Sequence, residues 1–200
     1  MIRILIFLSL SVPVFAQKNM MNMSDMAPMN AIKTKNIFIL QMDTMMRKMD
    51  KVNLTNAIES DFLRLMIPHH QGAVKMSLYE IAHGNSKEMI QLAKSIIAEQ
   101  QMEIKMMNKL LSFAYNPVPI DIKTQWDATM NTMMKDMPKT NTFKNIDVAF
   151  AKVMMPHHQA GIDMAKILLK YGNDYKIIRM AENIISSQEI EIEQMKNYIK

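Results

Sequence analysis

The sequence predicts an all-α protein, built as a duplicated helical bundle with about three helices in each half. Three observations support this fold class. Residues 42–112 align without a gap with residues 130–200, and 25 of the 71 aligned pairs are identical. Apolar residues recur in both copies at the intervals of three and four positions that are typical of helices. Only 4 glycines and 7 prolines occur in the 200 residues, which disfavours a turn-rich β sandwich.

The N-terminal residues are expected to precede the fold. Arg3, an apolar run over residues 4–10 and a segment ending at Ala16 indicate a signal peptide over residues 1–16. The run is short for a membrane span, so an uncleaved anchor is the less favoured alternative and stable membrane insertion is not expected. Residues 17–35 show no period and form an expected flexible, Met-rich arm, whose thioethers either gather a soft metal ion or only reflect composition. A removed signal peptide predicts a periplasmic or secreted protein.

Each copy is expected to contain three helices, the first copy over residues 36–115 and the second over 120–200. The first helix carries the pattern M-x-x-M-M-x-x-M. The second ends at a glycine, and the third follows a polar pair that supplies N-cap candidates. A proline in the second helix either kinks it or marks a helix start just before two histidines. In the two copies, the second helix is expected to begin near Thr55 or Asn56 and near Thr142, its proline is Pro68 or Pro156, its final glycine is Gly84 or Gly172, and the polar pair is Asn85-Ser86 or Asn173-Asp174.

The linker between the copies bears on how the two halves are arranged, and the composition excludes several classes of site and partner. The short segment from Asn116 to Pro119 favours contact between the two halves. The chain contains 25 methionines and no cysteine, which excludes thiolate metal sites, disulfides, thiol catalysis and blue-copper centres. The formal net charge of +5 is modest, and no dense basic stripe with interleaved aromatics occurs, so nucleic acid is not an expected partner.

The His-His segment is the strongest candidate for metal binding. On a helix, Met66 shares a face with His69 and His70, and Met76 follows His69 by two turns. Imidazole suits copper and zinc, whereas a neutral thioether selects soft ions such as Cu(I) and Ag(I). The alternative is that the histidines cap helices or pack within the bundle. Their duplication favours ligands, and the second copy carries the same set as Met154, His157, His158 and Met164.

Four methionines on one helical stripe are a second candidate set. Methionine is usually a flexible core residue, so packing is the first alternative. Because the stripe occurs in both copies of a chain that is also rich in isoleucine, functional thioethers are favoured, and one stripe can serve both purposes. The stripes are Met42, Met45, Met46 and Met49 in the first copy, and Met130, Met133, Met134 and Met137 in the second.

A third set of helical residues provides a carboxylate near the histidines. Such a carboxylate could orient a histidine ring through its free N–H, as is common around metal sites. It could instead be a hard metal ligand or a solvated surface charge. The residues are Gln100, Glu103 and Met107, matched by Gln188, Glu191 and Met195.

The sequence contains no motif typical of an enzyme. It has no H-E-x-x-H, no P-loop and no G-x-S-x-G. Glu80 and His83 have the Glu-x-x-His spacing of di-iron bundles, but the matching positions are Leu168 and Tyr171. His83 is therefore expected to be an ordinary helix-end histidine. The protein is not expected to be an enzyme, and a redox enzyme using a bound metal is the weakest hypothesis.

The segment from Met66 to Met76, with its Met-x-Pro-His-His-Gln core, and the later Gln100, Glu103, Ile104 and Met107 resemble the family named domain of unknown function 305. The second copy resembles it too, so the likeness covers residues 40–200. It implies a ferritin-like bundle, usually exported, and some relatives of the CopM type are periplasmic copper-binding proteins associated with copper tolerance. By that likeness the His and Met residues of both His-His segments are the candidate ligands. One difference between the copies, Gly72-Ala73 against Ala160-Gly161, argues against equal affinity of the two halves.

The sequence therefore predicts an exported copper-binding protein that buffers or transfers Cu(I), with Ag(I) as a further ion. One site is expected in each half, between the Met-stripe helix and the His-His helix, and a copper-handling protein would be a candidate partner. The alternative is a Met-rich helical interaction module that binds peptides or proteins without metal.

Overall fold

The computed structural model describes residues 36–113, 115–117, 121–139 and 144–200, and in these ranges it contains helices and no strand. This confirms the predicted all-α fold. The expected signal peptide and Met-rich arm lie outside the described residues. The helices are α1 (Ile37–Met49), α2 (Ile58–His83), α3 (Lys87–Leu110), α4 (Ile122–Asp136), α5 (Ile146–Tyr171) and α6 (Tyr175–Tyr198). Each copy thus supplies three helices, as predicted.

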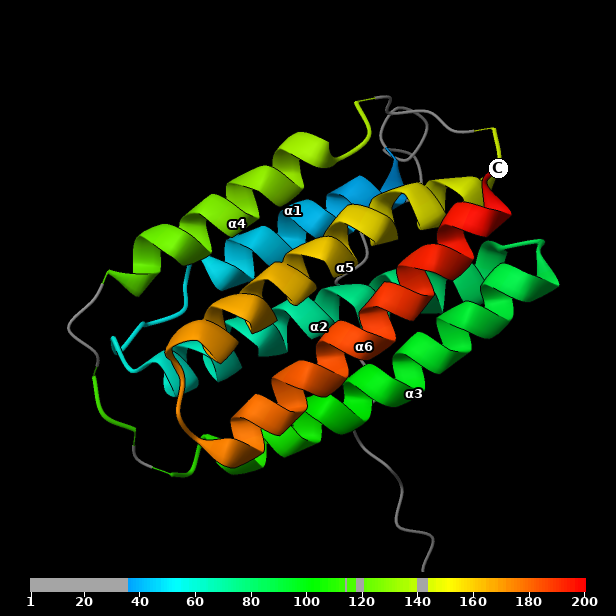
Figure 1. The fold of residues 1–200 in the computed structure, drawn as a ribbon. Helices are drawn as coiled ribbons and strands as arrows, with labels where there is room; N and C mark the ends of the chain where they lie inside the picture. The colour runs from blue at the N-terminus through cyan, green and yellow to red at the C-terminus, as the bar shows by residue number, and fades with distance from the viewer. Residues whose placement is uncertain (1–35, 114, 118–120, 140–143) are drawn as a thin grey trace, which may run out of the picture.

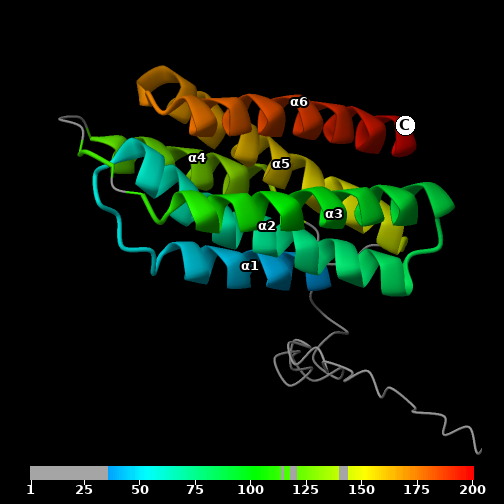
Figure 2. The same ribbon diagram turned by 90° about the horizontal axis from the view of Figure 1, so that it is seen from below.

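The six helices form three layers of two, with one helix of each copy in every layer (Figure 1). Helices α2 and α5 make the central layer. Helices α1 and α4 lie on one side of it, and α3 and α6 lie on the other. The view from below shows the first copy and the second copy lying beside one another (Figure 2). Because equivalent helices are neighbours, the molecule has an approximate two-fold axis through its middle.

The boundaries of the second helix of each copy differ slightly from the prediction. Helix α2 begins at Ile58, because Thr55 is tied to the Asp61 carboxylate by both its N–H and its hydroxyl, and Asn56 has a φ of 60° that a helix does not allow. Helix α5 begins at Ile146, where the Asn145 side chain accepts the N–H of Val148. The expected start near Thr142 lies outside the described residues.

The two prolines do not mark helix starts. Helix α2 runs through Pro68 and helix α5 runs through Pro156, so the histidines that follow each proline lie in the middle of a long helix. The glycines at the helix ends are confirmed as final caps, but neither is left-handed, with φ of −67° at Gly84 and −81° at Gly172. Gly84 is required by space instead, because a Cβ there would lie 2.9 Å from Asp147 Oδ1.

The two copies are joined at both ends by reciprocal caps. Asp147 Oδ1, in the first turn of α5, accepts the N–H groups of Asn85 at 2.9 Å and Ser86 at 2.8 Å, before α3. Glu59 Oε1, in the first turn of α2, accepts the N–H of Asn173 at 2.8 Å before α6. Glu59 and Asp147 are equivalent in the repeat. Each copy therefore caps a loop of the other, which makes α2 and α5 antiparallel neighbours.

Candidate metal centre

The four histidines of the His-His segments meet at the centre of the molecule. All are fully buried. His69 of α2 and His157 of α5 lie face to face, with ring centroids 3.8 Å apart and planes inclined by 30°. We call these two residues the central histidine pair. The sequence places one site in each half, whereas the structure brings the two His-His segments together on the approximate two-fold axis.

Hydrogen bonds define which ring nitrogens of two of these histidines carry protons. A carbonyl oxygen can only accept, so His157 Nε2 donates its proton to His69 O at 3.1 Å. His70 Nε2 lies 2.8 Å from Glu103 Oε2. When the glutamate is ionised this ring nitrogen is the donor, and the Nδ1 atom keeps its lone pair. Six ring nitrogens are buried and lack hydrogen-bond partners: Nδ1 of His70 and His157, and both nitrogens of His69 and of His158.

The two glutamates of the third predicted residue set contact histidines. Glu103 of α3 contacts His70, and Glu191 of α6 contacts His158, whose Nε2 lies 2.7 Å from Glu191 Oε2. Both glutamates are buried, which excludes the solvated surface charge that the sequence left open. The His158 contact is the shorter of the two, but His158 Nε2 makes no hydrogen bond, whereas His70 Nε2 does. The halves are therefore similar but not identical.

The electrostatics keep the central histidine pair neutral. Burial lowers the pKa of both rings well below its usual value, and the neighbouring histidines lower it further. The hydrogen bond from His157 Nε2 to His69 O raises the pKa of His157 but does not offset burial. A neutral imidazole has a free lone pair, so the two rings are in the form that binds a metal ion.

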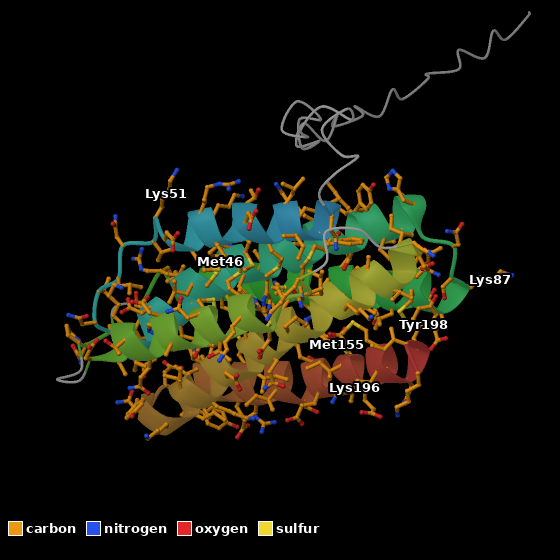
Figure 3. All side chains as sticks on the ribbon, turned by 90° about the horizontal axis from the view of Figure 1, so that it is seen from above. Met46, Lys51, Lys87, Met155, Lys196 and Tyr198 are labelled. Carbon is orange, nitrogen blue, oxygen red and sulfur yellow. The ribbon has the colours of Figure 1, made fainter. Side chains whose placement is uncertain are left out.

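Most of the predicted methionines belong to the buried core of the bundle. Those of the His-His segments are fully buried, namely Met66, Met76, Met154 and Met164. In each stripe three of four are buried, namely Met42, Met45, Met49, Met130, Met133 and Met137, whereas Met46 and Met134 are half-buried. Figure 3 shows Met46 near the surface of α1 and Met155 on α5. Met107 and Met195, from the third set, are fully buried as well. Burial of these thioethers fits packing and metal binding equally.

The glycine difference between the copies has a structural cause. A Cβ at Gly72 would lie 2.8 Å from Met45 Sδ and 3.2 Å from Met45 Cβ, so glycine there allows α1 to approach α2. A Cβ at Gly161 would lie 2.4 Å from Gln188 Oε1, so glycine there makes room for a side chain of α6. The sequence located a close approach in each copy, but the partner helix differs between them.

Polar residues near the centre include two that were predicted and one that was not. The predicted residues, Gln100 and Gln188, are buried, and neither the nitrogen nor the oxygen of their amides has a hydrogen-bond partner. Glu99 of α3 was not predicted, and its carboxylate interacts with the side chain of Ser187 of α6. Burial raises the pKa of Glu99, the Ser187 side chain opposes this, and the Glu191 and Glu103 carboxylates add to the increase. The signal available in the sequence was that Glu99 and Ser187 are equivalent positions of the repeat.

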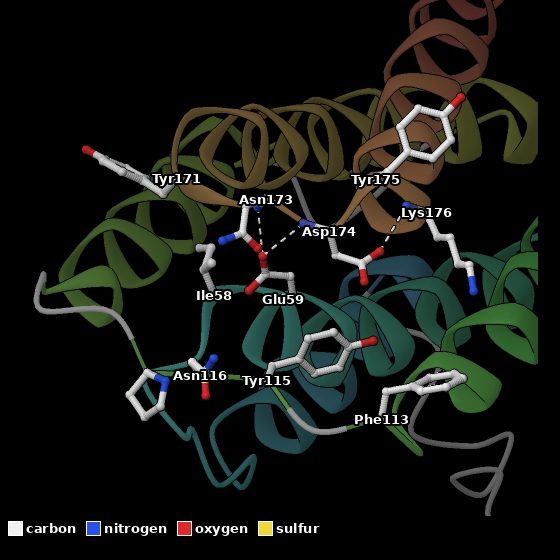
Figure 4. Close-up of a pocket in the computed structure, with 11 residues that line it drawn as sticks. Ile58, Glu59, Phe113, Tyr115, Asn116, Tyr171, Asn173, Asp174, Tyr175 and Lys176 are labelled. Atoms are coloured by element: carbon white, nitrogen blue, oxygen red, sulfur yellow. Dashed lines mark hydrogen bonds between the residues drawn. The ribbon is translucent and has the colours of Figure 1, made fainter.

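A pocket at one end of the bundle is separate from the histidines. It has a volume of about 620 Å³ and is lined by aromatic residues of both copies, among them Phe113, Tyr115 and Tyr175. Figure 4 shows Glu59 at its wall, hydrogen-bonded to the backbone before α6. No predicted ligand lines this pocket. His83, by contrast, is an exposed residue at the end of α2 that stacks on Tyr79, as expected of a helix-end histidine.

Comparison with known proteins identifies the family. The model of the family described as Domain of unknown function (DUF305) matches residues 13–111 and 120–199. The chain belongs to this family. No curated protein matches it in sequence.

Solved structures of the family share the fold. CopM in its Ag-bound form, obtained by co-crystallisation, is 31% identical, with 70% of this chain and 93% of that chain covered and a TM-score of 0.55. CopM in its Cu(I)-bound form is 29% identical, with 73% and 96% covered and a TM-score of 0.53. A family member from Streptomyces coelicolor is 25% identical, with 72% and 92% covered and a TM-score of 0.56. No helix within the described ranges is long and apolar enough to cross a membrane.

Proposed function

We propose that this protein binds a soft metal ion, Cu(I) or Ag(I), at its buried histidines and the methionines around them, and that it acts as an exported copper buffer or carrier rather than as an enzyme. One observation carries the proposal. Six ring nitrogens of the four buried histidines have no hydrogen-bond partner, and these histidines belong to a bundle whose core is rich in methionine. An unpaired buried polar atom is costly, and a metal ion would satisfy it.

The donor set fits a soft ion. Neutral imidazole and thioether groups suit Cu(I) and Ag(I), and neither needs to lose a proton in order to bind. Among the described residues, no three His, Asp or Glu side chains come together as a ligand group. Ligands from this region would therefore combine histidine nitrogen with methionine sulfur. The Glu103 contact would hold the His70 ring in place, because a second partner fixes the orientation of a ligand ring.

The relatives support the same metal and location. CopM has been solved with Cu(I), Cu(II) and Ag bound, and the Streptomyces coelicolor protein is described as secreted. The expected signal peptide agrees with export. A role in copper tolerance follows from the family resemblance.

The proposal is tested by anaerobic titration of the purified protein with Cu(I) against a chromophoric chelator, with Zn(II) in parallel. We expect Cu(I) to compete and Zn(II) to bind weakly. Replacing both residues of the central histidine pair by alanine should weaken Cu(I) binding at least about tenfold while helicity is retained. His83→Ala is the matched control, since this histidine is exposed and lies outside the centre. If Cu(I) fails to compete with the chelator, the histidines and methionines are packing residues only.

The interaction module is the second candidate function. Met102 and Met106 of α3 lie one turn apart, are 57% and 48% exposed, and present flexible apolar side chains to solvent. This candidate predicts capture of a protein or peptide partner that chelators do not disturb. Replacing both methionines by glutamine should abolish capture without changing Cu(I) affinity.

A further inference from the structure

The approximate two-fold axis brings equivalent residues together in two layers. In the central layer it passes the central histidine pair, whose positions are equivalent in the repeat. In the outer layer of α3 and α6 it passes Glu99 and Ser187, which are also equivalent and whose side chains interact. The approximate two-fold axis therefore runs from the surface between α3 and α6 to the buried histidines.

Carboxylates lie along this line. Glu99 is half-buried, and its carboxylate interacts electrostatically with Glu103, Glu191 and His158. Glu103 and Glu191 in turn contact the ring nitrogens of His70 and His158. Side chains of these two glutamates retain a small exposed fraction, 9% and 8%, whereas the histidines have none. The glutamates thus connect the buried rings to the surface of the α3–α6 layer.

Two unpartnered amides are an independent indication that this region receives a ligand. Gln100 and Gln188 are only 2% exposed, and their amide oxygens and nitrogens have no hydrogen-bond partner. Each lies three positions before the glutamate of its own helix, on the same helix face. Gln188 Oε1 also lies beside Gly161, one turn beyond His158. An amide oxygen in this position can coordinate a passing cation, and its burial without a partner otherwise only costs stability.

We propose that the seam between α3 and α6, with Glu99 at its mouth, is the site where a cation is collected and admitted to the buried histidines. This inference rests on the proposed function. The route leads from carboxylates through imidazoles toward the Met-rich helices α1 and α4 on the far side of the central layer. A local negative charge is needed because the chain carries a net charge of +5, which repels cations from the surface as a whole.

The experiment measures the rate of Ag⁺ uptake by rapid mixing in chloride-free nitrate buffer, with a fluorescent indicator of free Ag⁺. Glu99→Gln should slow uptake about three- to tenfold at low ionic strength, without changing the number of ions bound at equilibrium. The difference should shrink as added nitrate screens the charge. Glu189→Gln is the matched control, because it removes the same charge from an exposed position two residues from Ser187, on the other face of α6.

A second variant guards against a folding defect in the first. Ser187→Lys places a positive charge at the mouth from the α6 side, on a half-buried residue, and should slow uptake more than Glu99→Gln. Circular dichroism checks that the variants are folded. Equal rates for Glu99→Gln, Ser187→Lys and Glu189→Gln would overturn the proposed route while leaving the proposed function intact. Failure of the unmodified protein to bind either Ag⁺ or Cu(I) at equilibrium would overturn the proposed function itself.

Discussion

Glu80 provides a sharp test of how the two copies are held together. It lies at the end of α2, is buried, and contacts Asp147, the residue that caps the loop before α3. Burial, together with the hydrogen bond to Asp147 and the charge of Asp147, raises the pKa of Glu80 to about 8. The pKa of Asp147 is lowered, because the N–H groups of Ser86 and Asn85 and the Glu80 side chain outweigh its own burial. Glu80 therefore keeps its proton at neutral pH and donates it to Asp147.

The change that we propose is Glu80→Gln, which keeps a donor toward Asp147 but cannot ionise. The unfolded chain releases the Glu80 proton near pH 4.5, whereas the folded protein holds it to about pH 8. Between these values the contribution of Glu80 to the stability of the unmodified protein falls as pH rises, and above them this contribution is constant. A tenfold change in proton affinity is worth about 1.4 kcal/mol. Allowing for solvent screening at the end of the bundle, we expect a total of roughly 2–4 kcal/mol.

The assay is denaturant unfolding followed by circular dichroism at pH 5, 6.5 and 8.5, and the quantity of interest is the difference in unfolding free energy between variant and unmodified protein. All other titrating groups contribute equally to both unfolding free energies, so their contributions cancel in this difference. It should be small at pH 5 and should favour the variant increasingly up to pH 8.5. Glu88→Gln, at an exposed position of α3, is the control and should show no such trend.

Two results would refute the reasoning. If the difference does not change with pH, Glu80 is not protonated in the folded protein. If Glu80→Gln is less stable at every pH, the contact with Asp147 requires an ionised glutamate. A further variant, Glu80→Leu, reproduces Leu168 of the second copy, and by analogy with that copy it should fold and lose the same pH dependence.

Three further predictions test packing and caps. Glu59→Ala removes the acceptor of two backbone N–H groups before α6 and should cost about 1–3 kcal/mol of unfolding free energy. Gly72→Ala should destabilise by about 1–3 kcal/mol, since Met45 Cβ cannot move without α1, whereas Gly161→Ala should cost less because only a side-chain end must shift. In the Glu80→Gln variant, which lacks the opposing Glu80 titration, stability measured by the same assay should fall as the pH drops below 6.5, because the unfolded chain then takes up protons that the central histidine pair does not accept.

The helices and much of the site could be predicted from the sequence because they follow local rules. Helical periodicity located the six helices, and side-chain caps at Ser86 and Asp174 begin α3 and α6 where polar pairs were expected. The repeat identified the histidines, and a carboxylate at helical spacing suggested the partner that Glu103 proves to be for His70. Helix starts were displaced by a few residues where a loop conformation, as at Asn56, competes with the helix.

The relation between the two copies could not be predicted in the same way. A duplicated sequence is compatible with two separate bundles or with one shared core, because the spacing within a copy says nothing about contacts between copies. The caps made by Glu59 and Asp147 were detectable only as an acidic residue retained at equivalent positions. Their distant targets depend on the antiparallel packing of α2 against α5.

By itself, the sequence determined an all-α duplicated protein, its absence of thiol chemistry, and a set of histidines, methionines and glutamates in each copy. Only the tertiary structure decided that the histidines of both copies meet in one buried centre, with His69 stacked on His157. The physical reason is that each copy has a helix with apolar faces on more than one side, which three helices alone cannot cover. Burying α2 against α5 covers both helices at once and places equivalent residues on a common axis.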